Sequence, residues 1–327
     1  MNRILLVCLL NMLMLPLSQA NIFDEFVMID EQATFINGKD HLVSPDVDNH
    51  PLDHSYVLNE RAAALSAMAV TVDGTQYQAQ ILPKALALFE QAIAVLERQN
   101  LRHLLFNREH QGPLLASKQV INHIPNVVIG DDNRIQITDT LIRPHVYNGR
   151  IDTGCTGTLI DTKHVLTAGH CVSDGEGHWY SDLNFTVAQN GNIKPWGTTK
   201  WQKVLTTTAW HKSGNYDFDF AIIVLDQAPH SGHAGWGTYR EGIYSVTGYP
   251  ADKLWRTMWT DSGEIVSSTY RLCYTLDTSA GQSGSGIKDE AGYVRGVHST
   301  GSSSQNCGIR LTSTVFALLQ SWIAANP

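Results

Sequence analysis

Short apolar runs dominate the chain after residue 126. β-branched and aromatic residues cluster in these runs, and Gly, Asn, Asp and Pro separate one run from the next. Examples are Thr158-Leu159-Ile160, His164-Val165-Leu166, Phe220-Ala221-Ile222-Ile223-Val224 and residues 293–297. Many short strands with frequent turns are typical of a β-sandwich or β-barrel. The pattern therefore predicts an all-β domain over residues 127–327.

Two other parts of the chain have helical periodicity. Near the end, Val315, Leu318, Leu319 and Trp322 fall on one face, which predicts a C-terminal helix over residues 314–325 packed on the β domain. Residues 21–126 are predicted to be mainly helical. Residues 61–70 are rich in alanine, and a second stretch begins at Pro83, which suits a first helical turn, with Leu86, Phe89 and Ile93 at helical spacings.

Residues 1–20 have the layout of a secretory signal peptide. Arg3 provides a positive charge, residues 4–15 are apolar, and the segment ends in small residues at Ser18 and Ala20. The apolar stretch is shorter than the roughly 20 residues that cross a bilayer, which argues against a membrane anchor. We expect cleavage after Ala20 and a secreted, extracellular protein with no membrane attachment.

Composition narrows the possible partners. The chain has 43% hydrophobic and 17% charged residues and a formal charge of -8, with no cluster of Lys and Arg. Binding to nucleic acid requires such clusters to contact phosphates, so we predict no nucleic-acid partner. Residues 194–203 do interleave lysines with Trp196 and Trp201, but this pattern is more typical of a solvated hairpin.

The cysteines indicate an oxidising compartment. Cys8 lies in the predicted signal peptide, which leaves Cys155, Cys171, Cys273 and Cys307. Three pairings are possible, and the clustering of the residues favours Cys155–Cys171 and Cys273–Cys307. A metal site is the alternative, but no CxxC spacing supports it. His230-x-x-His233 has no further ligand nearby, so we predict no metal and no cofactor.

A glycine-rich segment, residues 277–286, contains a candidate nucleophile for acyl transfer, Ser283. Such chemistry also requires a base, an acid that orients the base, and donors for the oxyanion. Gly281 allows a turn in which the N–H groups of Gly281 and Ser283 point at one oxygen, and Gly284 leaves room beside the hydroxyl. A flexible Gly/Ser loop without chemistry is the alternative interpretation.

His170 is the candidate base. It follows a strand-like run and precedes Cys171, and a Cys155–Cys171 disulfide would hold its loop, stabilising the fold by roughly 3 kcal/mol. A surface histidine beside a structural disulfide is the alternative. The orienting acid is expected at the start of a buried strand, which favours Asp219 directly before the 220–224 run, with Asp217 as the competitor.

The order of these residues separates two classes of hydrolase. An α/β-hydrolase needs G-x-S-x-G, with its acid and histidine after the serine. Ser285 stands where that motif needs Gly, and His298 is the only histidine after Ser283. The order His170, Asp219, Ser283 instead matches proteases built from two β-barrels.

The β domain resembles the chymotrypsin fold and, within it, the bacterial secreted glutamyl endopeptidases, namely the staphylococcal V8 protease and its Bacillus relatives. The resemblance extends along nearly all of residues 127–327, whereas residues 21–126 match nothing convincingly. Its main stretches are Val127-Val128-Ile129, Thr167-Ala168-Gly169-His170-Cys171, Gly248-Tyr249-Pro250-Ala251-Asp252-Lys253, Gly281-Gln282-Ser283-Gly284-Ser285 and Gly296-Val297-His298.

The resemblance implies two antiparallel six-stranded β-barrels, a serine endopeptidase that acts on proteins or peptides through an acyl-enzyme, and a mature chain that begins at Val127. Residues 1–20, 21–126 and 127–327 are then a signal peptide, a propeptide and the protease domain. The propeptide would inhibit the enzyme or assist its folding. An interaction domain that stays attached is the alternative. We expect a monomer.

The resemblance also implies a pocket for glutamate, with aspartate second. His298 and Thr278 would line it, the α-amine of Val127 would help to bind the carboxylate, and Ser299 to Gly301 would pair with the substrate backbone. The chain departs from the family at Gly286, which replaces a common proline, and at Asp277. A carboxylate at Asp277 could instead favour cleavage after Arg or Lys. A catalytically silent binding protein on this fold is the alternative from another class.

Overall fold

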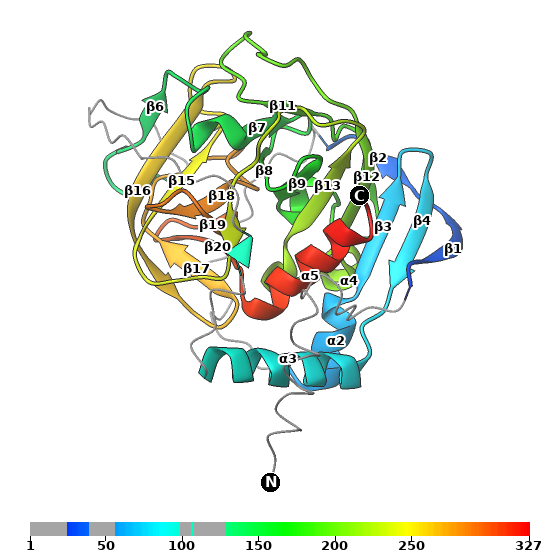
Figure 1. The fold of residues 1–327 in the computed structure, drawn as a ribbon. Coiled ribbons are helices and arrows are strands. Elements are labelled where there is room, and N and C mark those ends of the chain that lie inside the picture. The colour runs from blue at the N-terminus through cyan, green and yellow to red at the C-terminus, as the bar shows by residue number, and fades with distance from the viewer. Residues whose placement is uncertain (1–24, 39–55, 99–105, 108–127) are drawn as a thin grey trace.

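The chain folds into two β-barrels that a C-terminal helix covers, with an N-terminal region against one side (Figure 1). This computed structural model describes residues 25–38, 56–98, 106–107 and 128–327. The predicted signal peptide and Val127 lie outside these residues. Among the helices described, none combines the length and apolar composition needed to cross a lipid bilayer.

The first barrel is antiparallel, with the strand order β12-β13-β9-β8-β7-β11. Its strands are β7 (Asn148–Ile151), β8 (Thr156–Leu159), β9 (His164–Thr167), β11 (Phe185–Val187), β12 (Trp201–Thr207) and β13 (Ala221–Leu225). A bridge between Phe185 and Thr199 closes the ring next to the start of β12. All of β13 is buried between β12 and β9, as its continuous apolar run predicted.

The second barrel closes directly, because β18 pairs with both β15 and β19. Its strands are β15 (Ile243–Gly248), β16 (Met258–Ser267), β17 (Arg271–Tyr274), β18 (Gly286–Asp289), β19 (Val294–Gly301) and β20 (Asn306–Arg310). Shorter strands attach to the two sheets: β6 (Ile135–Ile137) on β16, β14 (Trp236–Gly237) on β19, and β5 (Phe106–Asn107) on β14. The predicted chymotrypsin-like fold of two barrels is therefore confirmed.

Helix α5 (Ser313–Ala324) packs against both sheets. Its first turn is capped by Thr312, whose hydroxyl accepts a hydrogen bond from the Val315 N–H. Trp322 stacks on Phe220 at 5.7 Å between ring centroids, and Phe316 contacts Trp236 at 4.6 Å. These contacts bury the apolar face that predicted the helix.

The N-terminal region contains strands as well as helices, so its prediction as mainly helical was incomplete. Its helices are α2 (Leu58–Leu65) and α3 (Pro83–Arg98), and its strands are β1 (Val27–Gln32), β2 (Phe35–Ile36), β3 (Ala67–Thr71) and β4 (Thr75–Ala79). The helix predicted for residues 61–70 ends at Leu65, because Ser66 adopts an extended conformation. Strand pairing of β3 on both edges outweighs the helical propensity of its alanines.

Strand β3 continues the first barrel's sheet outward in the order β12-β3-β4-β1 (Figure 1). Ala67, Met68, Ala69 and Val70 are all at most 2% exposed. The ammonium of Lys203 on β12 lies 4.7 Å from the ring centroid of Tyr77 on β4. Trp201 is also buried, so the second half of the 194–203 segment is part of this sheet rather than a solvated hairpin.

Both predicted disulfides are present. Cys155 bonds to Cys171 with a Cα–Cα distance of 5.9 Å, and Cys273 bonds to Cys307 with 4.1 Å. The second bond joins residues that face each other in the β17–β20 pair. Each disulfide links segments of one barrel, and the first one fixes the loop that precedes β8 to the segment that follows β9.

We predict that a charge at Ala69 unfolds the contact between the N-terminal region and the barrel. Ala69 is fully buried between Leu205 and Tyr77, so an aspartate there would bury an unpaired carboxylate. Ala69→Asp should lower the free energy of unfolding by about 3 kcal/mol or more. Val72→Asp is the matched control, because Val72 is 59% exposed. Urea unfolding of the full chain, carrying Ser283→Ala to prevent proteolysis, measures both; equal effects would contradict the prediction.

We also predict that stability falls as pH drops from 7 to 5. Burial lowers the pKa of His145 and His211 to about 4 and that of His298 to about 3, from an ordinary value of 6.5. Below pH 6.5 the unfolded chain therefore binds more protons than the folded protein. Each histidine should destabilise the fold by on the order of 1 to 2 kcal/mol over this window. Urea unfolding at several pH values tests this, and an unchanged free energy at pH 5 would refute it.

Candidate active site

The loop after β9 holds His170 in place. His170 lies in a short 3-10 helix, Gly169–Cys171, which the disulfide of Cys171 fixes to the start of β8. The ring of Trp210 meets the imidazole edge-on at 6.0 Å between centroids. A Cβ on Gly169 would lie 2.6 Å from this tryptophan, so glycine permits the close approach.

Asp219 orients the imidazole of His170. One carboxylate oxygen accepts a hydrogen bond from the backbone N–H of His170 at 2.7 Å, and the other lies 2.8 Å from Nδ1 of the ring. The hydroxyl of Ser299 donates to the second oxygen as well. Burial raises the pKa of Asp219, but the neighbouring His170 and these hydrogen bonds outweigh burial and lower it below its ordinary value. An ionised Asp219 favours a proton on Nδ1, which leaves a lone pair on Nε2.

Nε2 of His170 is buried and has no hydrogen-bond partner among the described residues. It is thus free to accept a proton.

Asp217, the competing acid, has other partners. Its carboxylate accepts from Nε of Arg271 at 2.8 Å and from the hydroxyl of Tyr56 at 2.9 Å. It therefore links the N-terminal region to β17 rather than facing His170.

Two glycines shape the turn around Ser283. Gly281 has a φ of +93°, and a Cβ there would lie 2.5 Å from the carbonyl oxygen of Tyr249. Gly284 has a φ of +84° and no space for a Cβ beside Thr167. Within the described part of the chain, the N–H groups of Gly281 and Ser283 have no acceptor. These two donors can therefore bind an oxyanion.

His298 and Thr278 are both 1% exposed. His298 lies within β19, and Thr278 lies near the start of the nucleophile loop, residues 277–283. Nδ1 of His298 lies 2.7 Å from the hydroxyl of Tyr274 on β17. Burial lowers the pKa of His298 to about 3, with a smaller contribution from His170, and burial raises the pKa of Tyr274 well above its usual value. A neutral histidine thus faces a hydroxyl that keeps its proton.

Tyr274 was not a candidate in the sequence. It has no motif of its own, and only the pairing of β17 and β19 with β20 brings it to His298.

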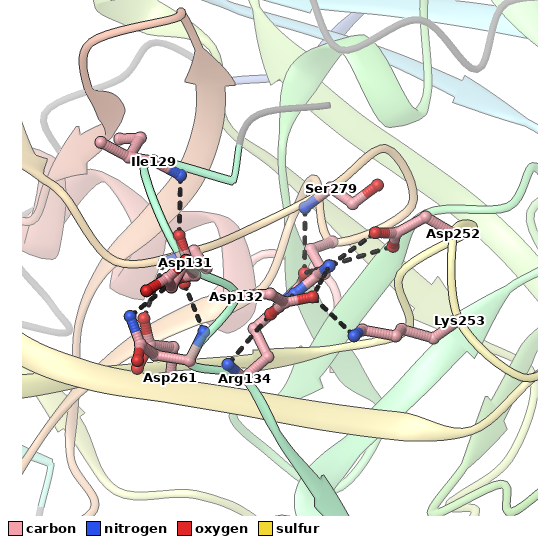
Figure 2. Close-up of polar contacts among 11 residues, drawn as sticks. Ile129, Asp131, Asp132, Arg134, Asp252, Lys253, Asp261 and Ser279 are labelled. Atoms are coloured by element: carbon pink, nitrogen blue, oxygen red, sulfur yellow. Dashed lines mark hydrogen bonds and ion pairs between the residues drawn. The ribbon is translucent and has the colours of Figure 1, made fainter. Parts of the chain in front are cut away.

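Asp277 binds backbone rather than facing an open pocket. Its two oxygens accept from the N–H groups of Ile129 at 2.8 Å and Asn133 at 2.7 Å (Figure 2). Asp277 as a whole is only 1% exposed to solvent. Both oxygens of Asp277 therefore bind backbone N–H groups, which weakens the argument for cleavage after Arg or Lys.

Ser299 and Gly301 lie on β19, whose one edge pairs with β20. On the other edge, β18 reaches only as far as Val297, and no described strand continues beside residues 299–301. This edge has the geometry to accept an added strand. Ser299 also donates to Asp219, a role that the sequence did not indicate.

The histidine and cysteine groups offer poor metal ligands. Over the described ranges, three ligand atoms converge only at Cys155, His170 and Cys171, where the two sulfurs form a disulfide. His230 and His233 instead bond to nearby backbone, His230 with Gly232 and His233 with Ala234.

Comparison with known proteins agrees with this fold. Residues 155–297 match the family described as trypsin-like peptidase domain. The chain is 33% identical over 219 residues to a glutamyl endopeptidase of Bacillus licheniformis, an alignment that covers 60% of this chain and 68% of the relative. It is 35% identical over 220 residues to a Bacillus subtilis protein named extracellular metalloprotease, covering 61% and 70%.

A solved structure of a Glu endopeptidase in complex with MPD superimposes with a TM-score of 0.55 at 27% identity. That match covers 59% of this chain and 97% of the other. Over residues 25–38, 56–98, 106–107 and 128–327, the one convergent group of possible metal ligands is Cys155, His170 and Cys171, and its two cysteines form a disulfide. From the fold, the site and these relatives, we conclude that the chain belongs to the glutamyl-endopeptidase-like serine proteases of the chymotrypsin fold and is a serine endopeptidase that acts on proteins or peptides.

Proposed function

We propose that this endopeptidase works through a triad of Ser283, His170 and Asp219. The observation that carries the proposal is the buried carboxylate of Asp219, which forms hydrogen bonds with both the ring Nδ1 and the backbone N–H of His170. This arrangement leaves Nε2 able to take the proton of Ser283. A catalytically silent binding protein would have no need for an ionised, fully buried carboxylate directed at a histidine.

The reaction follows from these groups. Ser283 Oγ attacks the scissile carbonyl while His170 Nε2 takes the hydroxyl proton, and the N–H groups of Gly281 and Ser283 bind the oxyanion. His170 then donates the proton to the leaving amine as the C–N bond breaks, which gives an acyl-enzyme. Water attacks this ester with His170 again as base, and the proton returns to Ser283 as the acid product leaves.

We further propose a preference for glutamate before the cleaved bond, with aspartate second. The Tyr274 hydroxyl can donate to Nδ1 of His298, so the ring proton resides on Nε2 as a donor for the carboxylate. Thr278 adds a hydroxyl, and the α-amine of Val127, which lies outside the described residues, would add positive charge. Residues 299–301 would bind the substrate backbone. The Bacillus licheniformis relative named glutamyl endopeptidase and the solved Glu endopeptidase structure support this specificity.

We also propose that the protein is a secreted zymogen with a signal peptide over 1–20, a propeptide over 21–126 and a monomeric mature domain over 127–327. The N-terminal region adds strands to the outside of a barrel that is already complete in its ring of six strands. Because β3 covers the edge of β12, the region is suited to assist folding of the first barrel and to stay bound after cleavage.

The specificity test is kcat/KM on matched peptides that differ only in the residue before the cleaved bond. We expect Glu to exceed Gln and Lys by at least about 100-fold, since a site built to bind a polar group rejects analogues that lack it. Ser283→Ala is the control and should lose at least about 1,000-fold in kcat while remaining folded. Full activity of this variant would refute the triad, whereas a preference for Lys would refute only the glutamate pocket.

The zymogen proposal predicts the first residue of the active enzyme. N-terminal sequencing of the secreted, active protein should find Val127. An active enzyme that begins at Asn21 would instead indicate an interaction domain that stays attached.

A further inference from the structure

The segment from Ile129 to Arg134 lies against the nucleophile loop, residues 277–283 (Figure 2). Asp277 holds the segment's backbone at Ile129 and Asn133. The backbone N–H of Asp277 itself donates to Asp261 on β16 at 2.7 Å. The first residue of the loop is therefore attached to both the segment and the second barrel.

Arg134 forms the other attachment. Its guanidinium is completely buried and binds Asp132 through Nε at 3.0 Å and Nη2 at 2.8 Å. It also binds Asp252 through Nη1 at 3.0 Å and Nη2 at 2.5 Å (Figure 2). Two paired contacts of this kind fix the plane of a guanidinium, because its donors form a rigid fork.

The same Nη1 of Arg134 also reaches the side chain of Gln282. Oε1 of Gln282 lies 3.4 Å from this nitrogen and accepts from the backbone N–H of Ser279 at 3.0 Å. Because both neighbours are donors, the oxygen of the amide must face them. Gln282 is fully buried. Its neighbours in the chain are Gly281 and Ser283, whose N–H groups are the proposed oxyanion donors.

We infer that Arg134 acts through Gln282 as a positioning residue for the turn that binds the oxyanion. The side chain of Gln282 ties Ser279 to Arg134, so the peptide units between them cannot rotate independently of the guanidinium. This inference rests on the proposed roles of Ser283 and Gly281, but it does not depend on the preference for glutamate. Loss of this positioning should destabilise the transition state more than the bound substrate, because the N–H groups of Gly281 and Ser283 bind the oxyanion that forms there.

A purely structural role for the buried ion cluster would have a different signature. Lys253 belongs to the same cluster, since its ammonium lies 2.6 Å from Asp132, but its ammonium forms no hydrogen bond with Gln282. It is 15% exposed and lies over the ring of Trp259 at 4.4 Å. Removing Lys253 should therefore lower stability without disturbing the turn.

The test compares Gln282→Met, Gln282→Glu and Lys253→Met on the preferred peptide. We expect Gln282→Met to lower kcat about 10- to 100-fold with KM changed less than about twofold, because a small displacement of an oxyanion donor is costly. Gln282→Glu should keep kcat within about threefold. It retains an acceptor for both donors, and the Nε2 that it replaces has no partner among the described residues. Lys253→Met should keep kcat and lower the melting temperature.

Arg134→Lys provides a second variant that does not alter the loop. It keeps a positive charge between Asp132 and Asp252 but lacks the fork that reaches Gln282, so it should reproduce the loss of kcat. An unchanged kcat in Gln282→Met, or an equal loss in Lys253→Met, would overturn the inference. An active Ser283→Ala would overturn the proposed function together with this inference, whereas an inactive Ser283→Ala beside a fully active Gln282→Met would overturn this inference alone.

Discussion

One buried carboxylate joins the two barrels at the proposed catalytic site. Asp219 precedes β13 of the first barrel, and it accepts hydrogen bonds from His170 of the same barrel and from Ser299 on β19 of the second. A fully buried charge is tolerated only when donors surround it. The relative placement of the barrels is therefore tied to the orientation of His170, and a shift of β19 would leave this carboxylate under-satisfied.

The nucleophile loop crosses the same junction. Its Ser283 carbonyl accepts from the Thr156 N–H on β8 at 2.9 Å, and the Gly281 carbonyl accepts from the Thr156 hydroxyl at 2.7 Å. The N–H of Gly284 donates to the His298 carbonyl at 2.8 Å. Thr156 of one barrel thus holds the loop of the other. The Ser283 side chain and the N–H groups of Gly281 and Ser283 have no partner in the described part of the chain.

The features predictable from sequence were those encoded locally. The apolar run before Leu225 and the helical face ending at Trp322 gave correct elements. The GQSGS and AGHC segments supplied the candidates Ser283 and His170, and the structure pairs His170 with Asp219. The strand β3 was missed because alanines favour a helix until a partner strand is present. Tyr274, Arg134 and the backbone role of Asp277 depend on contacts between residues far apart in the chain, for which no local signal exists.

The pairing of β3 with β12 also affects how the protease reaches its native state. If the proposed cleavage after Asn126 takes place, the strand that pairs along residues 203–207 belongs to a separate chain. A mature molecule that unfolds would then need this strand from a separate molecule, so its refolding would become a concentration-dependent encounter. The persistence of the native mature enzyme would then depend on its barrier to unfolding rather than on its ability to refold.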